Sequence, residues 1–352
     1  MGIIVREAEL RRDRGALLAV LLRNRNPDQN EVREARFDWS YFSNPYGEPR
    51  AWLAINESSG KVIGMAGAFP RRVALRGKPV LCWNTGDFSI DREFRTLGVA
   101  LKLRQAEKCS VDRREMAFLY CYPMDRMRIV LEKAGHFALC TIPRHRMLLK
   151  FDDLLDRWIG ANALSSGLAR LANPFVFAWR GNVSRHRGLT VQLEPKMKFG
   201  KEYDELFERV RDSHSVITVR DSQFLTWRFL QSPLYRDIRI FRLCATKGRL
   251  RGYAVVDIAG RAAKVLDFLV DDESLIRALL GGLIRSLRRH GICRLALRAT
   301  DSNPGLKGLR SFGMVFHDFS DSSVMAYAPA NSSWLPFLNE GNWFMTQADR
   351  DV

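Results

Sequence analysis

The sequence lacks paired cysteines: its six cysteines lie apart, most of them inside apolar runs, and none forms a C-x-x-C pair. This usage argues against a disulfide framework and a cysteine-based metal site, and it is typical of reduced thiols in a cytoplasmic protein. A run of about 18 apolar residues, long enough to cross a bilayer, is also missing. Residues 1–6 do not have the apolar stretch of a signal peptide. We therefore expect a cytoplasmic protein without a membrane span.

The common short motifs of catalysis and metal binding are absent as well. The sequence contains no G-x-x-x-x-G-K-(S/T), no H-E-x-x-H, no G-x-S-x-G and no EF-hand loop. Its six histidines are dispersed. We therefore expect no metal site.

The chain has 352 residues, enough for roughly two domains, each with its own core. Hydrophobic residues make up 46% and charged residues 27%, which is typical of a globular chain. The formal net charge of +17 favours an anionic partner: a phosphorylated cofactor, a polyanionic substrate, nucleic acid or an anionic membrane surface. Nucleic acid is not favoured, because the arginine pairs are dispersed and no RNA-binding signature accompanies them.

Two segments of the sequence share the same landmarks in the same order. Each has a tryptophan, Trp39 or Trp227, six positions before a proline. Twenty-five residues after each tryptophan lies a glycine, Gly64 or Gly252, within a β-rich run. An Asp-Phe pair and a second glycine then follow in each segment: Asp87-Phe88 with Gly135, and Asp267-Phe268 with Gly313. We interpret the two segments as two copies of one fold.

Apolar periodicity and turn residues predict similar elements in both copies. In the first copy we expect a strand at 3–5, a helix at 12–23, three β-rich runs within 50–90, a helix at 98–111, a strand at 116–122, a helix at 124–134 and a closing strand at 137–149. In the second copy we expect strands near 239, 251 and 263, a helix at 274–290, a strand at 294–298 and a helix at 306–312. This order predicts an α/β (α+β) fold with two mixed-sheet domains in tandem, each a central sheet flanked by helices.

Residues 151–200 belong to neither copy. They contain Trp158-Ile159, an Ala- and Leu-rich stretch and the aromatic segment 174–180. We expect an amphipathic connector that rests on the core, and an interfacial membrane helix next to basic residues is the alternative. The predicted divisions are thus 1–150, the connector 151–200, 201–330, and a C-terminal tail at 331–352.

The most specific local pattern lies between a strand that ends near Ile90 and a helix that begins near Gly98. Arg95, Gly98 and Ala100 place a fixed positive charge and small side chains at the start of that helix. Free N–H groups at a helix N-terminus bind anions, and small residues let a phosphate approach the main chain. The pattern therefore indicates a phosphate site.

This Arg-x-x-Gly-x-Ala pattern after a strand resembles the cofactor motif of the GNAT acyltransferase superfamily. The order of elements in the first copy also resembles that fold, and the repeat implies a tandem GNAT protein. The resemblance implies that acetyl-CoA, or another acyl-CoA, binds with its pyrophosphate on the main chain of six residues: Arg95, Thr96, Leu97, Gly98, Val99 and Ala100. It also implies that the strand residues Phe88, Ser89 and Ile90 run beside the pantetheine arm, where a backbone N–H polarises the thioester carbonyl.

The second copy departs from this pattern, because three carboxylates at 271–273 stand where the anion loop is expected and would repel a pyrophosphate. The resemblance therefore implies a degenerate C-terminal copy. The general acid is also in doubt, because the tyrosine usual in the family is replaced by Leu131, four residues before Gly135. Tyr120 and Tyr122 are the nearest substitutes, on one face of their strand. Asp87 is the candidate base, direct or through water. For each of the three, ordinary packing or surface hydrogen bonding is the simpler explanation.

The leading hypothesis is an enzyme that transfers an acyl group from coenzyme A directly to an amine on a small molecule or glycan, such as an amino sugar or cell-envelope precursor. One alternative is a transferase that uses an aminoacyl-tRNA or acyl-carrier donor. Another is a non-catalytic tandem fold that binds a ligand or a polyanion. The sequence leaves peripheral membrane contact and the oligomeric state open.

Overall fold

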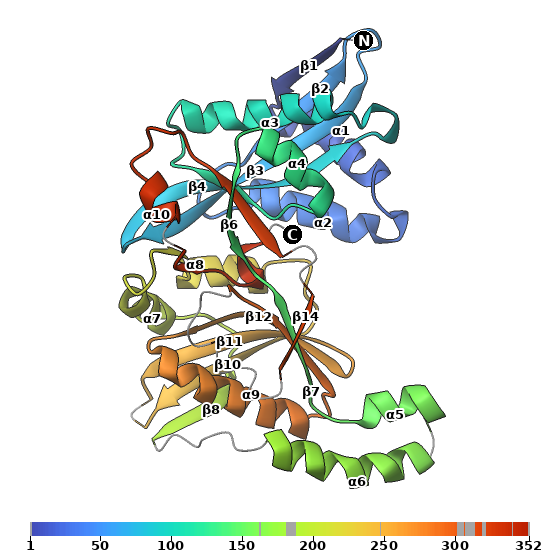
Figure 1. Ribbon diagram of the computed structural model, residues 1–352, viewed down its shortest axis with the longest axis vertical. Helices are drawn as coiled ribbons and strands as arrows, with labels where there is room; N and C mark the ends of the chain where they lie inside the picture. Colours follow the sequence, from blue (N-terminus) through green and yellow to red (C-terminus); the bar gives the residue numbers. More distant parts are fainter. Residues whose placement is uncertain are drawn as a thin grey trace.

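The computed structural model describes residues 2–161, 163–180, 188–246, 248–300, 306, 314–318, 322–339 and 341–350. Two mixed β-sheets, one above the other in Figure 1, are each flanked by helices. This arrangement confirms the predicted α/β fold class with two mixed sheets. The helix expected at 306–312, apart from Leu306, and the repeat glycine at 313 lie outside the described residues.

The first sheet is built mainly from the N-terminal half of the chain. Its strands are, in spatial order, β1 (Ile3–Glu7), β2 (Arg50–Asn56), β3 (Val62–Leu75), β4 (Lys78–Ile90), β5 (Leu119–Cys121), β15 (Ser323–Tyr327) and β6 (Phe137–Thr141). Off this path, β9 (Val216–Thr218) pairs with β3, and β16 (Trp343–Phe344) pairs with β9. The strands β1 to β4 form an antiparallel meander, and β5 lies parallel to β4.

The second sheet has seven strands, six from the C-terminal half of the chain and one, β7, from the N-terminal half. Their order is β14 (Val315–Asp318), β7 (Arg144–Leu148), β13 (Arg294–Arg298), β12 (Ala262–Val270), β11 (Leu250–Ala259), β10 (Ile238–Ala245) and β8 (Leu189–Leu193).

Each half contributes strands to the other half's sheet, which the sequence did not predict. The expected closing strand at 137–149 is two strands: β6 stays in the first sheet, whereas β7 enters the second, between β13 and β14. In return, β15 from the C-terminal half lies between β5 and β6. Figure 1 shows the long crossing from β6 to β7 between the sheets. Apolar alternation marks a segment as a strand but does not state which sheet it joins, so a fold complete in each half was the simpler expectation.

The helices are α1 (Leu10–Arg23), α2 (Asn30–Phe42), α3 (Leu97–Asp112), α4 (Asp125–Lys133), α5 (Asp152–Ile159), α6 (Ala163–Arg180), α7 (Lys201–Val210), α8 (Ser222–Leu225), α9 (Ile276–Arg289) and α10 (Leu335–Asn339). The predicted helices at 12–23, 98–111, 124–134 and 274–290 correspond to α1, α3, α4 and α9. Gly135 follows α4 with a φ of +86°, the left-handed conformation that glycine favours after a helix. The aromatic cluster around Trp39 lies in α2, a helix that the sequence analysis did not predict.

The internal repeat is visible in the strand register. Gly64 of β3 pairs with Ile90 of β4, and Gly252 of β11 pairs with Val270 of β12. In each copy the repeat aspartate, Asp87 or Asp267, lies three residues before that partner and beside a β-bulge. The equivalent landmarks therefore occupy equivalent places in the two sheets.

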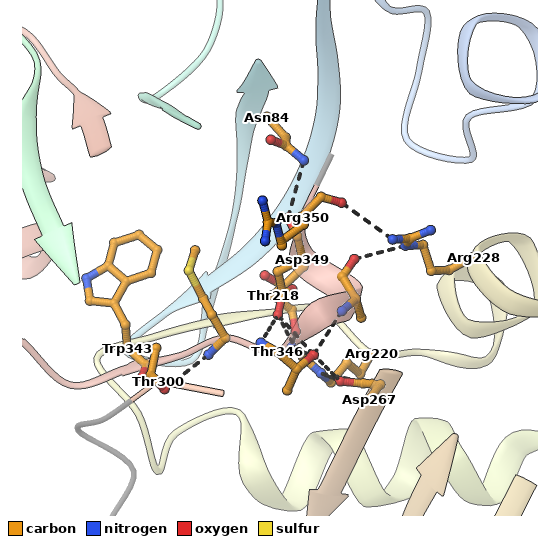
Figure 2. Close-up of polar contacts among 12 residues, drawn as sticks. Asn84, Thr218, Arg220, Arg228, Asp267, Thr300, Trp343, Thr346, Asp349 and Arg350 are labelled. Carbon is orange, nitrogen blue, oxygen red and sulfur yellow. Dashed lines mark hydrogen bonds and ion pairs between the residues drawn. The ribbon is translucent and has the colours of Figure 1, made fainter. Parts of the chain in front are cut away.

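The segment 341–350 crosses between the two sheets as part of the core (Figure 2). The fully buried Arg220 donates from Nη2 to Asp349 Oδ2 at 2.6 Å and from Nε to Asp267 Oδ1 at 3.1 Å. Thr346 Oγ1 donates to the same Asp267 oxygen at 2.7 Å. Burial opposes the charge of Arg220, but the two carboxylates raise its pKa above the usual value. Asn84 of β4 also donates from Nδ2 to the Asp349 carbonyl at 3.3 Å, so the segment 341–350 is bonded to both halves.

Candidate functional site

The parallel strands β4 and β5 separate part of the way along. Their pairing ends at Thr85 and Cys121, whereas β4 continues to Ile90 with β3 on its other side. Between Gly86 and Ser89 the ladder to β3 contains a bulge, and Asp87 adopts a φ of +49° there. A bulge bends its strand and increases the local twist. The result is an opening beside the last residues of β4.

A cavity of about 780 Å³ occupies this opening. It extends from Thr85 and Cys121, where the strands separate, to the start of α3 at Leu97. Nine of the residues singled out from the sequence line it: Asp87, Phe88, Ser89, Ile90, Arg95, Thr96, Leu97, Ala100 and Tyr122. Gly98, Val99 and Tyr120 do not.

The start of α3 forms one end of the cavity. Thr96 caps the helix, its Oγ1 accepting from the Val99 N–H at 3.4 Å. A Cβ atom added to Gly98 would meet no other atom within 4 Å, so the main chain is open to an approaching group there. Arg95 donates from Nε to the Ile90 carbonyl at 2.9 Å and from Nη2 to Asn24 Oδ1 at 3.0 Å. The guanidinium is therefore held between the end of β4 and α1.

The wall of the cavity is strongly positive. The cationic residues that line it are Arg25, Arg95, Arg104, Arg126 and Arg350. The one carboxylate in the described lining is that of Asp87, and both its oxygens accept from Arg36 Nη1 at 2.6 Å. Both partners of this ion pair are buried. Asp87 thus anchors β4 to α2, and the remaining lining favours an anionic ligand.

The candidate tyrosines are Tyr120 of β5 and Tyr122, which follows the strand, and their ring centroids lie 6.0 Å apart. Tyr120 is fully buried, and its hydroxyl donates to the Asp349 carbonyl at 3.4 Å. Tyr122 is at the cavity wall, and its hydroxyl contacts the Met345 sulfur at 3.5 Å. Burial raises the pKa of both hydroxyls well above the usual value. Leu131, at the place of the usual acid, packs in the core.

Four cationic residues of the cavity were not predicted from the sequence: Arg25, Arg104, Arg126 and Arg350. Arg104 of α3 donates from Nη1 to Glu107 Oε2 at 2.7 Å and to Thr85 Oγ1 at 3.2 Å, with its guanidinium 4.3 Å from the Phe88 ring centroid. Helical spacing places Arg104 on the buried face of α3 with Ala100. A charged residue on an apolar helix face was the sequence feature that could have indicated its role. Arg350 reaches the cavity from the far end of the sequence, and its guanidinium lies 5.5 Å from the Tyr122 ring centroid. No local pattern could reveal it.

No family model and no curated protein matches the sequence. Several solved structures match the fold. A protein of unknown function from Enterococcus faecalis, described as a probable N-acyltransferase, superimposes with a TM-score of 0.68 and 12% identity over 95% of this chain and 75% of its own. A GCN5-related N-acetyltransferase from Anabaena variabilis superimposes with a TM-score of 0.65 and 12% identity, over 92% of this chain and 72% of its own. A tandem GNAT protein from the clavulanic acid biosynthesis pathway superimposes with a TM-score of 0.55 and 13% identity, over 93% of this chain and 98% of its own. The chain therefore has the fold of the GNAT N-acetyltransferases, in a tandem arrangement.

Proposed function

We propose that the protein is an acyltransferase that moves an acyl group from coenzyme A to an amine. The observation that carries the proposal is that one cavity joins the free edge of β4 to the N-terminus of α3. A thioester with a long arm and a pyrophosphate needs both features: strand backbone beside the arm, and helix N–H groups at the phosphates.

The residues at the cavity suit such a donor. The first turn of α3 offers N–H groups without intrahelical acceptors, and the exposed Gly98, next to the cavity lining, leaves the main chain open to phosphate oxygens. Arg25, Arg95 and Arg126 would add positive charge around them. The donor would supply an activated acyl group, and the backbone of residues 88–90 would orient it. Acetyl-CoA is our first candidate.

We propose direct transfer to an amine held where β4 and β5 separate. Tyr122 is better placed than Tyr120 to protonate a leaving thiolate, because it lines the cavity and its hydroxyl contacts a weakly accepting thioether. Asp87 would act on the amine through water, since its two oxygens are engaged by Arg36. The acceptor would be a small molecule or a glycan, such as an amino sugar.

The second copy is proposed to be a degenerate, non-catalytic partner. At its equivalent loop, Asp271 pairs with Arg209 and Arg251, and Asp272 accepts from the Ser274 N–H at 2.9 Å. Carboxylates in these places disfavour a pyrophosphate. Apart from the exchanged strands, residues 1–150 would form the acyl-CoA unit and 201–330 the partner, with 151–200 as connector. A cytoplasmic location is proposed from the cysteine usage alone.

Calorimetric titration of the full chain with acetyl-CoA, a longer acyl-CoA and free coenzyme A tests the donor. We expect saturable binding of all three, followed by thiol release when a panel of amines, including glucosamine, is added. Folded protein that binds none of them would overturn the proposal and redirect the search to aminoacyl-tRNA or acyl-carrier donors. Binding without thiol release from any amine would support a ligand-binding protein instead.

A further inference from the structure

An apolar surface remains uncovered on the two helices α5 and α6, which pack against each other and project from the end of the second sheet (Figure 1). Leu164, Leu168 and Leu171 recur at helical spacing on one side of α6, with 64%, 42% and 70% of their surface exposed. Trp158 at the end of α5 is 79% exposed, and Ile159 follows it. These five side chains are called the apolar face below. Isolated exposed apolar residues are ordinary, but apolar residues repeated along one side of a helix mark an interaction site.

The side of α6 that carries Ser165 and Ala169 shows that the helix pair is held in place. Ser165 and Ala169, one helical turn apart, are buried there. Ser165 Oγ donates to Asp156 Oδ1 at 2.8 Å, and Asn173 Nδ2 donates to Asp152 Oδ2 at 2.8 Å. These bonds fix α6 against α5. The apolar face is therefore the outer side of a docked helix pair.

The charges of this region are arranged asymmetrically. All three carboxylates of α5 are engaged: Asp152 with Asn173, Asp153 with Arg294 at 3.0 Å, and Asp156 with Arg261 at 2.7 Å. The sequence of α6 contains no Asp or Glu, and its Arg170 is exposed. Asp153 and Asp156 are thus neutralised by arginines, Asp152 is bonded to a neutral amide, and α6 itself carries no acidic side chain.

We propose that the apolar face docks into the interface of an anionic lipid bilayer, with α6 parallel to the membrane plane. α6 has leucines on one side, arginines as its sole charges and no acidic residue, and an exposed tryptophan lies on the neighbouring α5. This is the composition of an interfacial helix. Charge complementarity favours this occupant over a second copy of the chain, because two copies would each bring a net charge of +17 to the contact. Among the described residues no helix is long and apolar enough to span a bilayer, so the contact would be peripheral.

Co-sedimentation of the full chain with vesicles tests this proposal, with phosphatidylcholine alone and with about 30% phosphatidylglycerol added as the anionic lipid. We expect binding to the anionic vesicles that weakens as salt is raised, and much weaker binding to phosphatidylcholine. The variant Leu164→Gln/Leu168→Gln/Leu171→Gln changes exposed side chains only, so it should fold like the wild type. We expect its affinity for anionic vesicles to fall by about a hundredfold or more, given the usual free energy of burying leucine side chains.

The matched control is Ile4→Gln/Leu193→Gln/Val315→Gln, which replaces three exposed apolar residues on strands away from α5 and α6. It should bind anionic vesicles like the wild type. Equal loss in both triple variants, no loss in either, or no vesicle binding by the wild type would overturn the proposal. A wild-type dimer in sedimentation velocity that the α6 variant alone abolishes, without vesicle binding, would assign the apolar face to self-association.

Discussion

The repeat tryptophans Trp39 and Trp227 stack on each other, with ring centroids 4.5 Å apart and ring planes 17° from parallel. The indole N–H of Trp39 also donates to the Trp227 carbonyl at 3.1 Å. Trp39 belongs to α2 of the first copy, and Trp227 follows α8 of the second. Two residues recognised as equivalent in the sequence therefore meet where the two copies pack.

Trp39→Ala should destabilise the protein by about 3–5 kcal/mol, since it leaves a large cavity at a buried contact. Trp39→Phe should cost less, because part of the ring contact is kept. Urea denaturation followed by circular dichroism measures the difference. Trp158→Ala, at a residue 79% exposed, is the control and should lie within about 0.5 kcal/mol of the wild type. Equal effects of Trp39→Ala and Trp158→Ala would contradict a structural role for the stack.

Arg220→Met should lower the free energy of unfolding by about 3–5 kcal/mol, because Asp267 and Asp349 would remain as two buried carboxylates without their cation. The same denaturation experiment applies. Arg239→Met removes a partly exposed ion pair with Asp237 and should cost less than about 1 kcal/mol. A small effect of Arg220→Met would show that the C-terminal segment does not depend on this network.

Asp87→Asn should also lower the free energy of unfolding by about 3–5 kcal/mol, since Arg36 would lose its buried counter-charge. Asp38→Asn, which breaks a pair with the partly exposed Arg14, is the control and should cost below about 1 kcal/mol. If Asp87 also acts on the amine, a variant that still folds at low temperature should lose turnover while its coenzyme A affinity is kept. Unchanged turnover would remove Asp87 from the proposed chemistry.

His136 should make the fold sensitive to acid. Burial, with Arg104 and Lys108 nearby, lowers its pKa to about 3, so it stays neutral in the folded state, whereas the unfolded chain takes up its proton near pH 6.5. The contribution of His136 to the free energy of unfolding is therefore greatest above pH 6.5. It decreases as the pH drops towards 3, by at most about 1.4 kcal/mol per pH unit. His136→Phe keeps a ring but cannot be protonated. The free energy of unfolding of this variant should fall less between pH 7 and 5 than that of the wild type, and parallel losses would contradict the assignment.

Local patterns were sufficient for much of the fold. The turn after α4, the meander of β2 to β4 and the start of α3 follow from residues close together in sequence, and so does the equivalence of Gly64 and Gly252. The exchange of β7 and β15 could not be predicted, because pairing partners are set by packing between halves. For the same reason Arg350 and the Arg36–Asp87 pair were not foreseen. Apart from Tyr122, the cavity residues that the sequence indicated lie on one continuous stretch from the end of β4 into α3.

The central claim is that the N-terminus of α3 binds the phosphates of coenzyme A, and two glycines test it most directly. Gly98 in α3 and Gly15 in α1 are both exposed helical positions at which an added Cβ would meet no atom within 4 Å, so either accepts a larger side chain. By calorimetry, Gly98→Glu should weaken acetyl-CoA binding by about a hundredfold or more, because a carboxylate would face the pyrophosphate, whereas Gly15→Glu should bind like the wild type. Wild-type affinity in Gly98→Glu, with the fold intact, would contradict the account.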